Sequence, residues 1–525
     1  MYRLNEQQTA LVEEARQLAD KQIAPHADAV DAQSRFPREA IEALAKSGFF
    51  GLTLPAEYGG KGQGLRVACA VLDEIAQRCA STAMIYLMHL SGCSCYVAAP
   101  QASEPVMRAA AAGKHLSTLA WSEKGSRSHF WAPVSQAAQN NGHVILNAQK
   151  SWVTSAGEAD GYVVSTRTPG GTAPTDSMLY LVMKGDTGMQ ISGAWSALGM
   201  RGNASSPMSF ENCAIPATRA LSETGKGFNM MLEVVLPWFQ LCNAAISVGL
   251  AEAAVRATTA HLTGKRFEHL NSALADLPNL RARLAQMRIE TDRARAHLVS
   301  VIDAVEQPGP ATMLFVLESK AAAAESAIRV TDIGMQACGG AAFSRHLSLE
   351  RNFRDARAAT VMAPTTGAKD SPQATLLPIH LLQQHGLIAG RDFTIRRFDV
   401  LVGKHGDHIG GELEALHSLQ KGESAACVAL DLNWERWQAD GTADPRQIIV
   451  LATTQPFDHC NFTVLESFPQ ADEERWKRVL FMMRYDNPAY REMMDMEGLK
   501  AWLPGRTAGY ANLTEAVQQQ KFFEK

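Results

Sequence analysis

The chain has 525 residues, of which 46% are hydrophobic and 20% charged, and its formal net charge is −4. This length predicts roughly three or four units of ~100–200 residues, and the charge gives no sign of a surface for nucleic acid or anionic membrane. No apolar run approaches the ~20 residues of a membrane span, and the N-terminus lacks an apolar signal-peptide core, so we expect a cytoplasmic protein. The nine cysteines show no zinc-ligand spacing, which predicts reduced thiols and no metal site.

Residues 1–115 are predicted to be helical, because apolar side chains recur at three- and four-residue steps, as at Leu11, Ala15 and Leu18. The glycine-rich segment 54–64 follows no predicted strand, although a phosphate-binding loop should follow one. We therefore interpret 54–64 as a connecting loop.

Residues 116–220 change to short segments rich in Val, Leu and Tyr that are separated by turn residues. The predicted strands are 143–147, 151–155, 161–168 and 178–184. They indicate a small antiparallel barrel or sandwich. Helical periodicity returns in 221–363, with one apolar face formed by Leu280, Leu284, Met287, Ala294, Leu298 and Val301. Long helices joined by short loops predict a helical bundle.

From residue 364 to the end, strand-like and helical segments alternate, which is typical of an α/β unit. The predicted strands are 393–398, 426–430 and 447–454, and the predicted helices are 376–386, 411–422 and 473–485. The expected fold is therefore multidomain α+β. It has an N-terminal helical domain, a middle antiparallel β domain, a helical bundle and a partial α/β domain.

Seven ordered motifs resemble the acyl-CoA dehydrogenase superfamily of FAD enzymes over about residues 1–365. They are LPAEYGG (54–60), WSEKGSRS (121–128), QKSWVTSAGEADGYVV (149–164), LGMRGNASSPMSFENCAIP (198–216), GKGFNMM (225–231), MQACGGAAF (335–343) and RNFRDAR (351–357). The resemblance implies an FAD cofactor, a homodimer or homotetramer, and a small-molecule substrate such as an acyl-CoA or a sulfur or nitrogen compound. It also implies an electron-transfer flavoprotein or a flavin reductase as redox partner.

A flavin ring needs a flat apolar surface beside it and a hydrogen-bond donor at its reactive edge. Trp152 can supply the surface, and Thr154, two residues along the same predicted strand, projects to the same face. The resemblance assigns further cofactor contacts to Trp121, Ser122, Ser128, Arg266, Phe267, Gln336, Gly339, Gly340 and Thr365. Gly264 stands where the family often has a phosphate-binding Arg, so Arg266 or Lys265 would have to replace it. Core packing of Trp152, and a helix C-cap at Gly339 and Gly340, remain open as alternatives.

The family removes an α-proton with a carboxylate that follows the RDA motif in a Glu-Gly-Thr segment, where this chain has Ala363-Pro364-Thr365. Other members carry the carboxylate on the first bundle helix, at about Phe239 here. Glu233 is the nearest carboxylate on that helix, but it lies nearly two turns away and is predicted to face elsewhere. Alanine cannot act as a base, which disfavours ordinary desaturation.

Three hypotheses follow from this departure. The first is a flavin monooxygenase that acts on a sulfur- or nitrogen-containing small molecule, with His89 as candidate proton donor; the alternative for His89 is a satisfied core histidine. The second is an acyl-CoA dehydrogenase with a relocated base such as Glu233. The third is an inactive flavoprotein fused to an anion-binding domain.

The segment from about 366 to 525 resembles the C-terminal part of the phosphate/phosphonate-binding proteins of ABC transporters. Its motif is Ser-Pro-x-x-Thr in GAKDSPQATLLPIHLLQQHGL (367–387), which implies an oxyanion at a helix N-terminus. The candidate anion-binding residues are Ser371, Gln373, Thr375 and His405. Simple N-capping by Ser371 is the alternative. The first lobe of such proteins has no counterpart here, so a half-site would leave the anion exposed.

Overall fold

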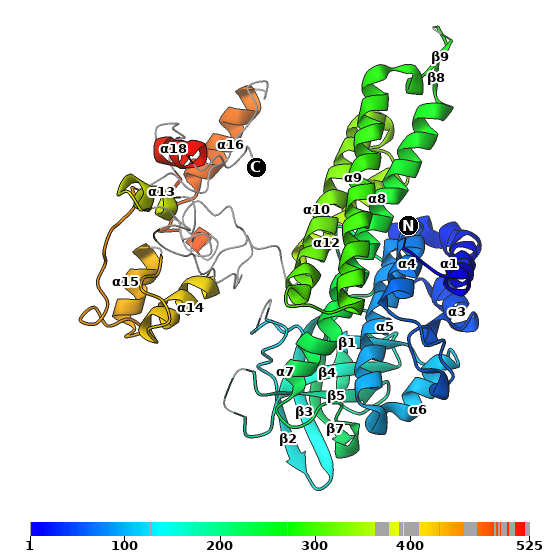
Figure 1. Cartoon of the computed structure of the whole chain (residues 1–525), viewed down its shortest axis with the longest axis horizontal. Coiled ribbons are helices and arrows are strands. Elements are labelled where there is room, and N and C mark those ends of the chain that lie inside the picture. Colours follow the sequence, from blue (N-terminus) through cyan, green and yellow to red (C-terminus); the bar gives the residue numbers. More distant parts are fainter. Residues whose placement is uncertain are drawn as a thin grey trace. The chain divides into compact units, whose positions relative to one another are not determined.

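The computed structural model describes residues 2–362 except 127, 128, 172, 174 and 270. Beyond these it describes 377–387, 392, 409–429, 431–455, 470–487, 490–491, 494, 501–502, 504 and 510–519. The chain forms two compact units, Met1–Thr366 and Gly367–Lys525 (Figure 1).

The first part of unit 1 is helical, as predicted. Its helices are α1 (Glu6–Leu18), α2 (Ala27–Gln33), α3 (Arg38–Lys46), α4 (Leu65–Ala76), α5 (Ala80–Ala98) and α6 (Pro100–Ala111). Asn5 caps α1 in a reciprocal pair with Gln8, and Gly48 takes a left-handed conformation (φ 71°) just beyond α3. The segment 54–64 holds a single short turn, Ala56–Tyr58, and follows no strand, so its interpretation as a connecting loop is confirmed.

Two sheets form the middle domain. The strands are β1 (Ser117–Ala120), β2 (Gln136–Asn140), β3 (His143–Val153), β4 (Gly161–Arg167), β5 (Ser177–Met183), β6 (Met189–Ile191) and β7 (Ser206–Pro216). Their orders are β1-β4-β5 and β2-β3-β7-β6, and β1–β4 is the one parallel pair among the described strands. The predicted strands 143–147 and 151–155 belong to the single strand β3, whose pairing with β7 shifts register between Lys150 and Val153.

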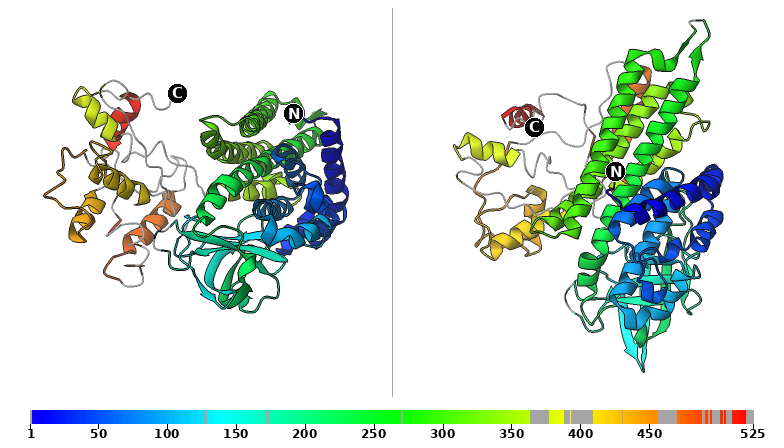
Figure 2. Two further views of the ribbon diagram at one scale, coloured as in Figure 1. Left: turned by 60° about the horizontal axis from the view of Figure 1, so that its bottom comes forward. Right: turned by 45° about the vertical axis from the view of Figure 1, so that its right-hand side comes forward.

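The predicted bundle consists of α8 (Leu236–Gly264), α9 (Pro278–Glu306) and α10 (Thr312–Cys338), which lie side by side in both views of Figure 2. The short elements α7 (Gly227–Asn229) and η6 (Met230–Val235) lead into α8, and α11 (Leu349–Ala356) and α12 (Ala358–Val361) follow α10. A hairpin of β8 (Arg266–Phe267) and β9 (Ser272–Ala273) connects α8 to α9. The helical run Gly227–Gly264 is long and apolar enough to cross a membrane, but 78% of its most apolar window is buried, as befits the central helix of a bundle.

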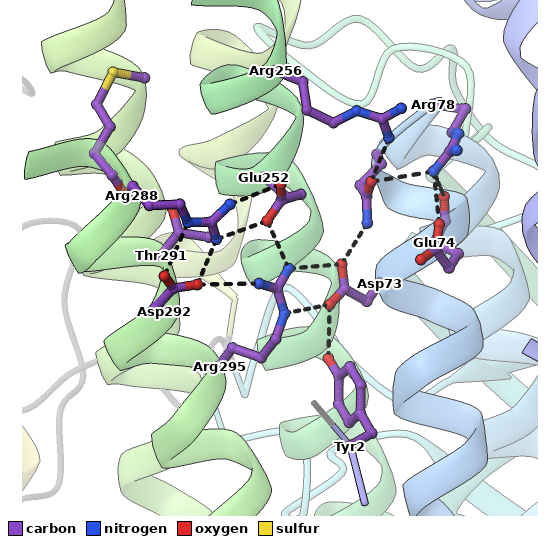
Figure 3. A network of polar contacts seen from close by, with 12 residues as sticks. Tyr2, Asp73, Glu74, Arg78, Glu252, Arg256, Arg288, Thr291, Asp292 and Arg295 are labelled. Atoms are coloured by element: carbon purple, nitrogen blue, oxygen red, sulfur yellow. Dashed lines mark hydrogen bonds and ion pairs between the residues drawn. The ribbon is translucent and has the colours of Figure 1, made fainter. Parts of the chain in front are cut away.

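A buried charge network ties the helical domain to the bundle (Figure 3). Arg295 on α9 contacts Asp73 on α4 (Nε to Oδ2, 3.0 Å) and Glu252 on α8 (3.1 Å). The Tyr2 hydroxyl donates to the same Asp73 carboxylate at 2.9 Å, and Arg288 holds Glu252 from the other side at 2.8 Å. Residues from three helices and the N-terminus therefore share one set of ion pairs.

Unit 2 contains α13 (Leu377–Gln384), α14 (Ile409–Gln420), α15 (Asp431–Ala439), α16 (Gln470–Met482) and α18 (Ala511–Gln519). The three predicted helices are confirmed. The strand predictions are wrong for 426–429 and 447–454, which form no strand, and 393–398 lies outside the described residues. A strand needs a neighbour to satisfy its backbone groups and cover its apolar face. Ile449, Val450 and Leu451 are instead exposed, so their β-propensity finds no partner sheet in the described part of this unit.

Candidate flavin site

Trp152 presents a flat apolar surface near the end of β3. Its side chain is 60% exposed, and its ring centroid lies 5.5 Å from that of Trp195, with the planes at 62°. Exposing a tryptophan beside a second aromatic ring leaves a large apolar face in water, which is typical of a binding surface. The alternative of core packing for Trp152 is therefore wrong.

Thr154 lies just beyond the end of β3 and is buried. Its hydroxyl is 2.9 Å from the Ser205 hydroxyl, and its carbonyl accepts from the Thr118 hydroxyl at 2.7 Å. The prediction that one regular strand carries both Trp152 and Thr154 is wrong, because β3 ends at Val153. The register shift between Lys150 and Val153 breaks the alternation, so the two side chains differ in exposure.

Trp121 and Ser122 follow β1 and lie next to the Trp152 segment. The Ser122 carbonyl accepts from the Ser151 backbone amide at 2.8 Å, which fixes this loop to β3. Trp121 is buried and stacks on Phe130 at 5.9 Å, and its indole N–H finds no acceptor among the described residues. The folded structure thus brings Trp121, Ser122 and Trp152 together, as the sequence predicts. Ser128 lies outside the described residues.

A buried ion pair supports this loop. The Lys150 ammonium contacts the Glu123 carboxylate, and both side chains are almost completely inaccessible. Lys150 also donates to the Ser165 hydroxyl at 3.0 Å and the Trp121 carbonyl at 3.3 Å. The other Glu123 oxygen accepts from the backbone amides of residues 134 and 135. Burial lowers the pKa of Lys150, while Glu123 opposes that shift. Both residues lie in the matching motifs 121–128 and 149–164, but sequence reasoning did not predict that they pair.

His89 lies in the core of the helical domain on α5. Its Nε2–H donates to the Phe50 carbonyl at 2.8 Å, and its Nδ1 accepts from the Ser117 backbone amide at 3.1 Å. Burial lowers the pKa of His89 to about 4. A neutral imidazole with both nitrogens engaged cannot hand a proton to a ligand, so the candidate proton donor is a satisfied core histidine.

The remaining predicted contacts lie elsewhere in unit 1. Arg266 is exposed on the β8–β9 hairpin and donates to the Asn271 carbonyl at 3.0 Å, while Phe267 packs against His269. Figure 1 places this hairpin at the end of the bundle remote from the β domain. Gln336, Gly339 and Gly340 are exposed at the end of α10. Gly339 is the C-cap of this helix, as the alternative predicted, and the contact of these residues with FAD stays a prediction. Thr365, Ser371, Gln373, Thr375 and His405 lie outside the described residues.

The two expected base positions hold no carboxylate. Phe239 is partly buried on α8, and Ala363 is the residue after the last described residue of unit 1. Glu233 is exposed on η6, where its carboxylate accepts from the Asn229 amide at 2.9 Å. As predicted, Glu233 does not face the interior.

Amide side chains on α8 were not predicted as site residues. Gln240 and Asn243 are fully buried, and the Asn243 amide nitrogen contacts the Met362 sulfur at 3.3 Å. Lys320 on α10 donates to the carbonyls of Ala359 (3.1 Å) and Met362. Burial lowers the pKa of Lys320 to about 7. Asn243 and Lys320 therefore both contact the segment that leads into Ala363.

A chain of contacts connects this segment to Trp152. The Trp195 indole N–H donates to the Met200 carbonyl at 3.2 Å, and the Met200 amide donates to Asp355 at 2.5 Å. Asp355 belongs to the RDA motif on α11, directly before α12. Burial raises the pKa of Asp355 to about 6. The aromatic surface and the α12 region are therefore parts of one connected structure.

Comparison with known proteins identifies the family. Models for the N-terminal, middle and C-terminal domains of acyl-CoA dehydrogenases match residues 5–104, 118–213 and 225–368. A probable acyl-CoA dehydrogenase of Mycobacterium tuberculosis, FadE25, is 30% identical over 68% of this chain and 92% of its own length. The chain belongs to the acyl-CoA dehydrogenase family. A model for the phosphonate-binding periplasmic protein of ABC transporters matches residues 351–510, so the chain is a fusion.

Other relatives extend the comparison. Cyclohex-1-ene-1-carbonyl-CoA dehydrogenase of Geobacter metallireducens is 28% identical over 70% of this chain and 96% of its own. The 3-(aryl)acrylate reductase of Clostridium sporogenes is 27% identical over 67% and 93%. The structure of butyryl-CoA dehydrogenase from Megasphaera elsdenii has a TM-score of 0.65 and 21% identity, and covers 69% of this chain and 95% of its own, which shows the shared fold.

The protein is an FAD-dependent oxidoreductase. Residues of the structure fit this cofactor, because three features lie together: the exposed indole of Trp152, the loop at Ser122, and the Trp121 indole N–H, which has no acceptor in the described part of the chain. The hypothesis of an inactive flavoprotein gains no support from this intact surface.

Proposed function

We propose that this chain is a flavin-dependent monooxygenase of the acyl-CoA dehydrogenase family that oxygenates sulfur or nitrogen in a small molecule. The observation that carries the proposal is the chemistry of the buried polar groups around α12. They are the amides of Gln240 and Asn243 and the amine of Lys320, whereas Phe239 and Ala363 stand at the positions of the family's carboxylate. An amide cannot accept an α-proton at neutral pH, so desaturation lacks its usual base.

FAD, when bound, supplies two-electron redox chemistry and, once reduced, the reaction with oxygen. The chain's own residues position the ring and shield it. Trp152 offers a face for stacking, Ser122 and the buried Lys150–Glu123 pair hold the adjoining loop, and Trp121 offers an indole N–H. This protein-side chemistry needs no carboxylate at the substrate.

The proposed reaction balances with two co-reactants. A thioether, O2, two electrons and two protons give a sulfoxide and water: one oxygen atom forms the S–O bond and the other leaves as water. The electrons come from a reduced nicotinamide through a partner flavin reductase. An acyl-CoA dehydrogenation would instead need an electron acceptor such as an electron-transfer flavoprotein.

The test uses the full-length holoenzyme. We expect butyryl-CoA without oxygen to leave the flavin absorbance unchanged. We expect flavin reduced by NADH and a flavin reductase to convert thioanisole into its sulfoxide under O2, with catalase present to remove free hydrogen peroxide. Rapid bleaching by butyryl-CoA, or no sulfoxide above a reaction without enzyme, contradicts the proposal.

The second candidate is an acyl-CoA dehydrogenase with a relocated base, which the names of the relatives favour. Glu233→Gln separates the two. If Glu233 were the base, this variant would lose bleaching by acyl-CoA at least about 100-fold, because positioned acid–base catalysis contributes ~10²–10⁴-fold. We expect instead no change in sulfoxide formation, because Glu233 is exposed and bonded to Asn229.

A further inference from the structure

We propose that Gln240 and Asn243 form an amide pair that binds an uncharged, hydrogen-bonding group of the substrate, of the carboxamide class. The inference deepens the proposed function and rests on it only for the identity of the oxidised atom. It assigns a specificity-determining role to two residues that no sequence motif singled out.

The geometry of α8 places the two amides together. Residues three apart lie on the same face of a helix, and Asn243 on that face contacts Met362. Both side chains are completely buried. Asn243 therefore contacts the end of the segment that follows α11, and Asp355 on α11 connects through Met200 and Trp195 to the exposed ring of Trp152.

The hydrogen bonds of this pair are incomplete. Neither the nitrogen nor the oxygen of the Gln240 amide has a partner among the residues that the structure describes, and the Asn243 oxygen likewise has none. The contact from Asn243 to a thioether sulfur is a weak hydrogen bond. Buried polar groups almost always find partners, because an unmade bond there carries the full penalty of desolvation. A ligand that supplies these bonds accounts for the two amides.

Lys320 sets the charge that the ligand can carry. Its ammonium group donates to the carbonyls of Ala359 and Met362, so it holds the segment across from the amides and is already engaged. No carboxylate among the described residues contacts Gln240, Asn243 or Lys320. A cationic ligand group would therefore be buried beside Lys320 without a counter-ion, which is strongly unfavourable. A carboxylate can only accept hydrogen bonds, so it would leave the Gln240 carbonyl oxygen unpaired.

The hydrogen-bond donors and acceptors of the two amides determine which ligand group can pair with them. A side-chain amide offers N–H donors and a carbonyl acceptor in one plane. A carboxamide offers the same set in return, so it can satisfy the open donor and acceptor of Gln240 together. An alkyl chain satisfies neither and would leave both unpaired. The structure therefore favours a carboxamide over the hydrocarbon tail of a simple acyl group.

The test compares three probes of one shape by calorimetric titration of the holoenzyme: benzamide, toluene and benzoate. We expect benzamide to bind at least about tenfold more tightly than toluene, which corresponds to one buried hydrogen bond. Benzoate should bind no better than toluene. The isosteric variants Gln240→Met and Asn243→Leu should each abolish the preference for benzamide. Thr258→Val, an isosteric change of a buried residue about five turns along the same helix, should preserve it.

The melting temperature of each variant without ligand distinguishes a ligand-binding role of the amides from a purely structural one. Gln240→Met should melt at or above the temperature of the unaltered protein, because it removes an unsatisfied amide. A lower melting temperature together with unchanged preference for benzamide would mean that internal water or protein satisfies Gln240, and would overturn the inference. Tighter binding of benzoate than of benzamide would also overturn the inference. If the enzyme forms sulfoxide but shows no preference for benzamide, this inference alone is refuted. If it prefers benzamide but forms no sulfoxide, only the proposed oxygenation is refuted.

Discussion

Removing the Asp73 carboxylate tests whether the network of Figure 3 holds the helical domain to the bundle. The Arg295 side chain is only 6% exposed, and Asp73 supplies its closest carboxylate contact at 3.0 Å. Asp73→Ala leaves Arg295 with Glu252 and the more distant Asp292 (3.8 Å), both of which Arg288 already engages, and deprives the Tyr2 hydroxyl of its acceptor. The variant therefore removes the closest counter-ion of a buried Arg295 and leaves the Tyr2 hydroxyl without its acceptor.

The expected loss follows from these contacts. Breaking a buried ion pair on one side costs about 3–5 kcal/mol, because the remaining charge stays in the interior. We expect the free energy of unfolding of unit 1 to fall by about this amount in Asp73→Ala, and by less in Asp73→Asn, which retains an oxygen for Tyr2. Urea unfolding followed by far-ultraviolet circular dichroism measures both, with the denaturant slope as a check that the unfolded state is unchanged.

Two comparisons sharpen this test. Arg3 pairs with Asp303 at the surface and is 71% exposed, so Arg3→Ala should hardly alter stability. Replacing Asp73 and Arg295 together by Leu and Met should recover most of the loss, since apolar groups of similar volume often match a buried pair. If Asp73→Ala is no more destabilising than Arg3→Ala, our reasoning about the network is wrong.

Three further predictions concern the flavin site and its surroundings. Lys150→Met leaves the Glu123 carboxylate buried and unpaired, so the purified variant should contain less than half of the FAD of the unaltered protein, measured by absorbance. Trp152→Ala should weaken FAD binding about tenfold or more without lowering the melting temperature, because the ring is exposed; Ile191→Ala, another exposed apolar residue, should do neither. His89 has a folded-state pKa of about 4, below the unfolded value of about 6.5, so the unfolded state binds the proton first as the pH falls. The free energy of unfolding should therefore decrease by about 3 kcal/mol between pH 6.5 and 4. His89→Gln should weaken this dependence on pH, measured by urea unfolding at each pH, while the variant retains FAD. An unchanged dependence on pH contradicts the assignment.

The sequence by itself determined the helical domain, the bundle and most strands of unit 1. Their apolar residues recur with the period of one element type, and neighbouring residues decide that period. The aromatic at position 152 and the loop at 121–122 were also readable, because ordered motifs marked them. In unit 2 the same local reasoning found three helices but misplaced two strands, since pairing depends on residues far along the chain.

Only the tertiary structure decided what the buried polar residues do. Sequence could not show that His89 bonds to Phe50 and Ser117, because those partners come from distant segments. It could not show that Glu123 pairs with Lys150, or that Gln240 and Asn243 are completely buried. The free energy of a polar group in the interior depends on whether a partner stands within hydrogen-bond reach, and that is a property of the folded arrangement and not of the local sequence.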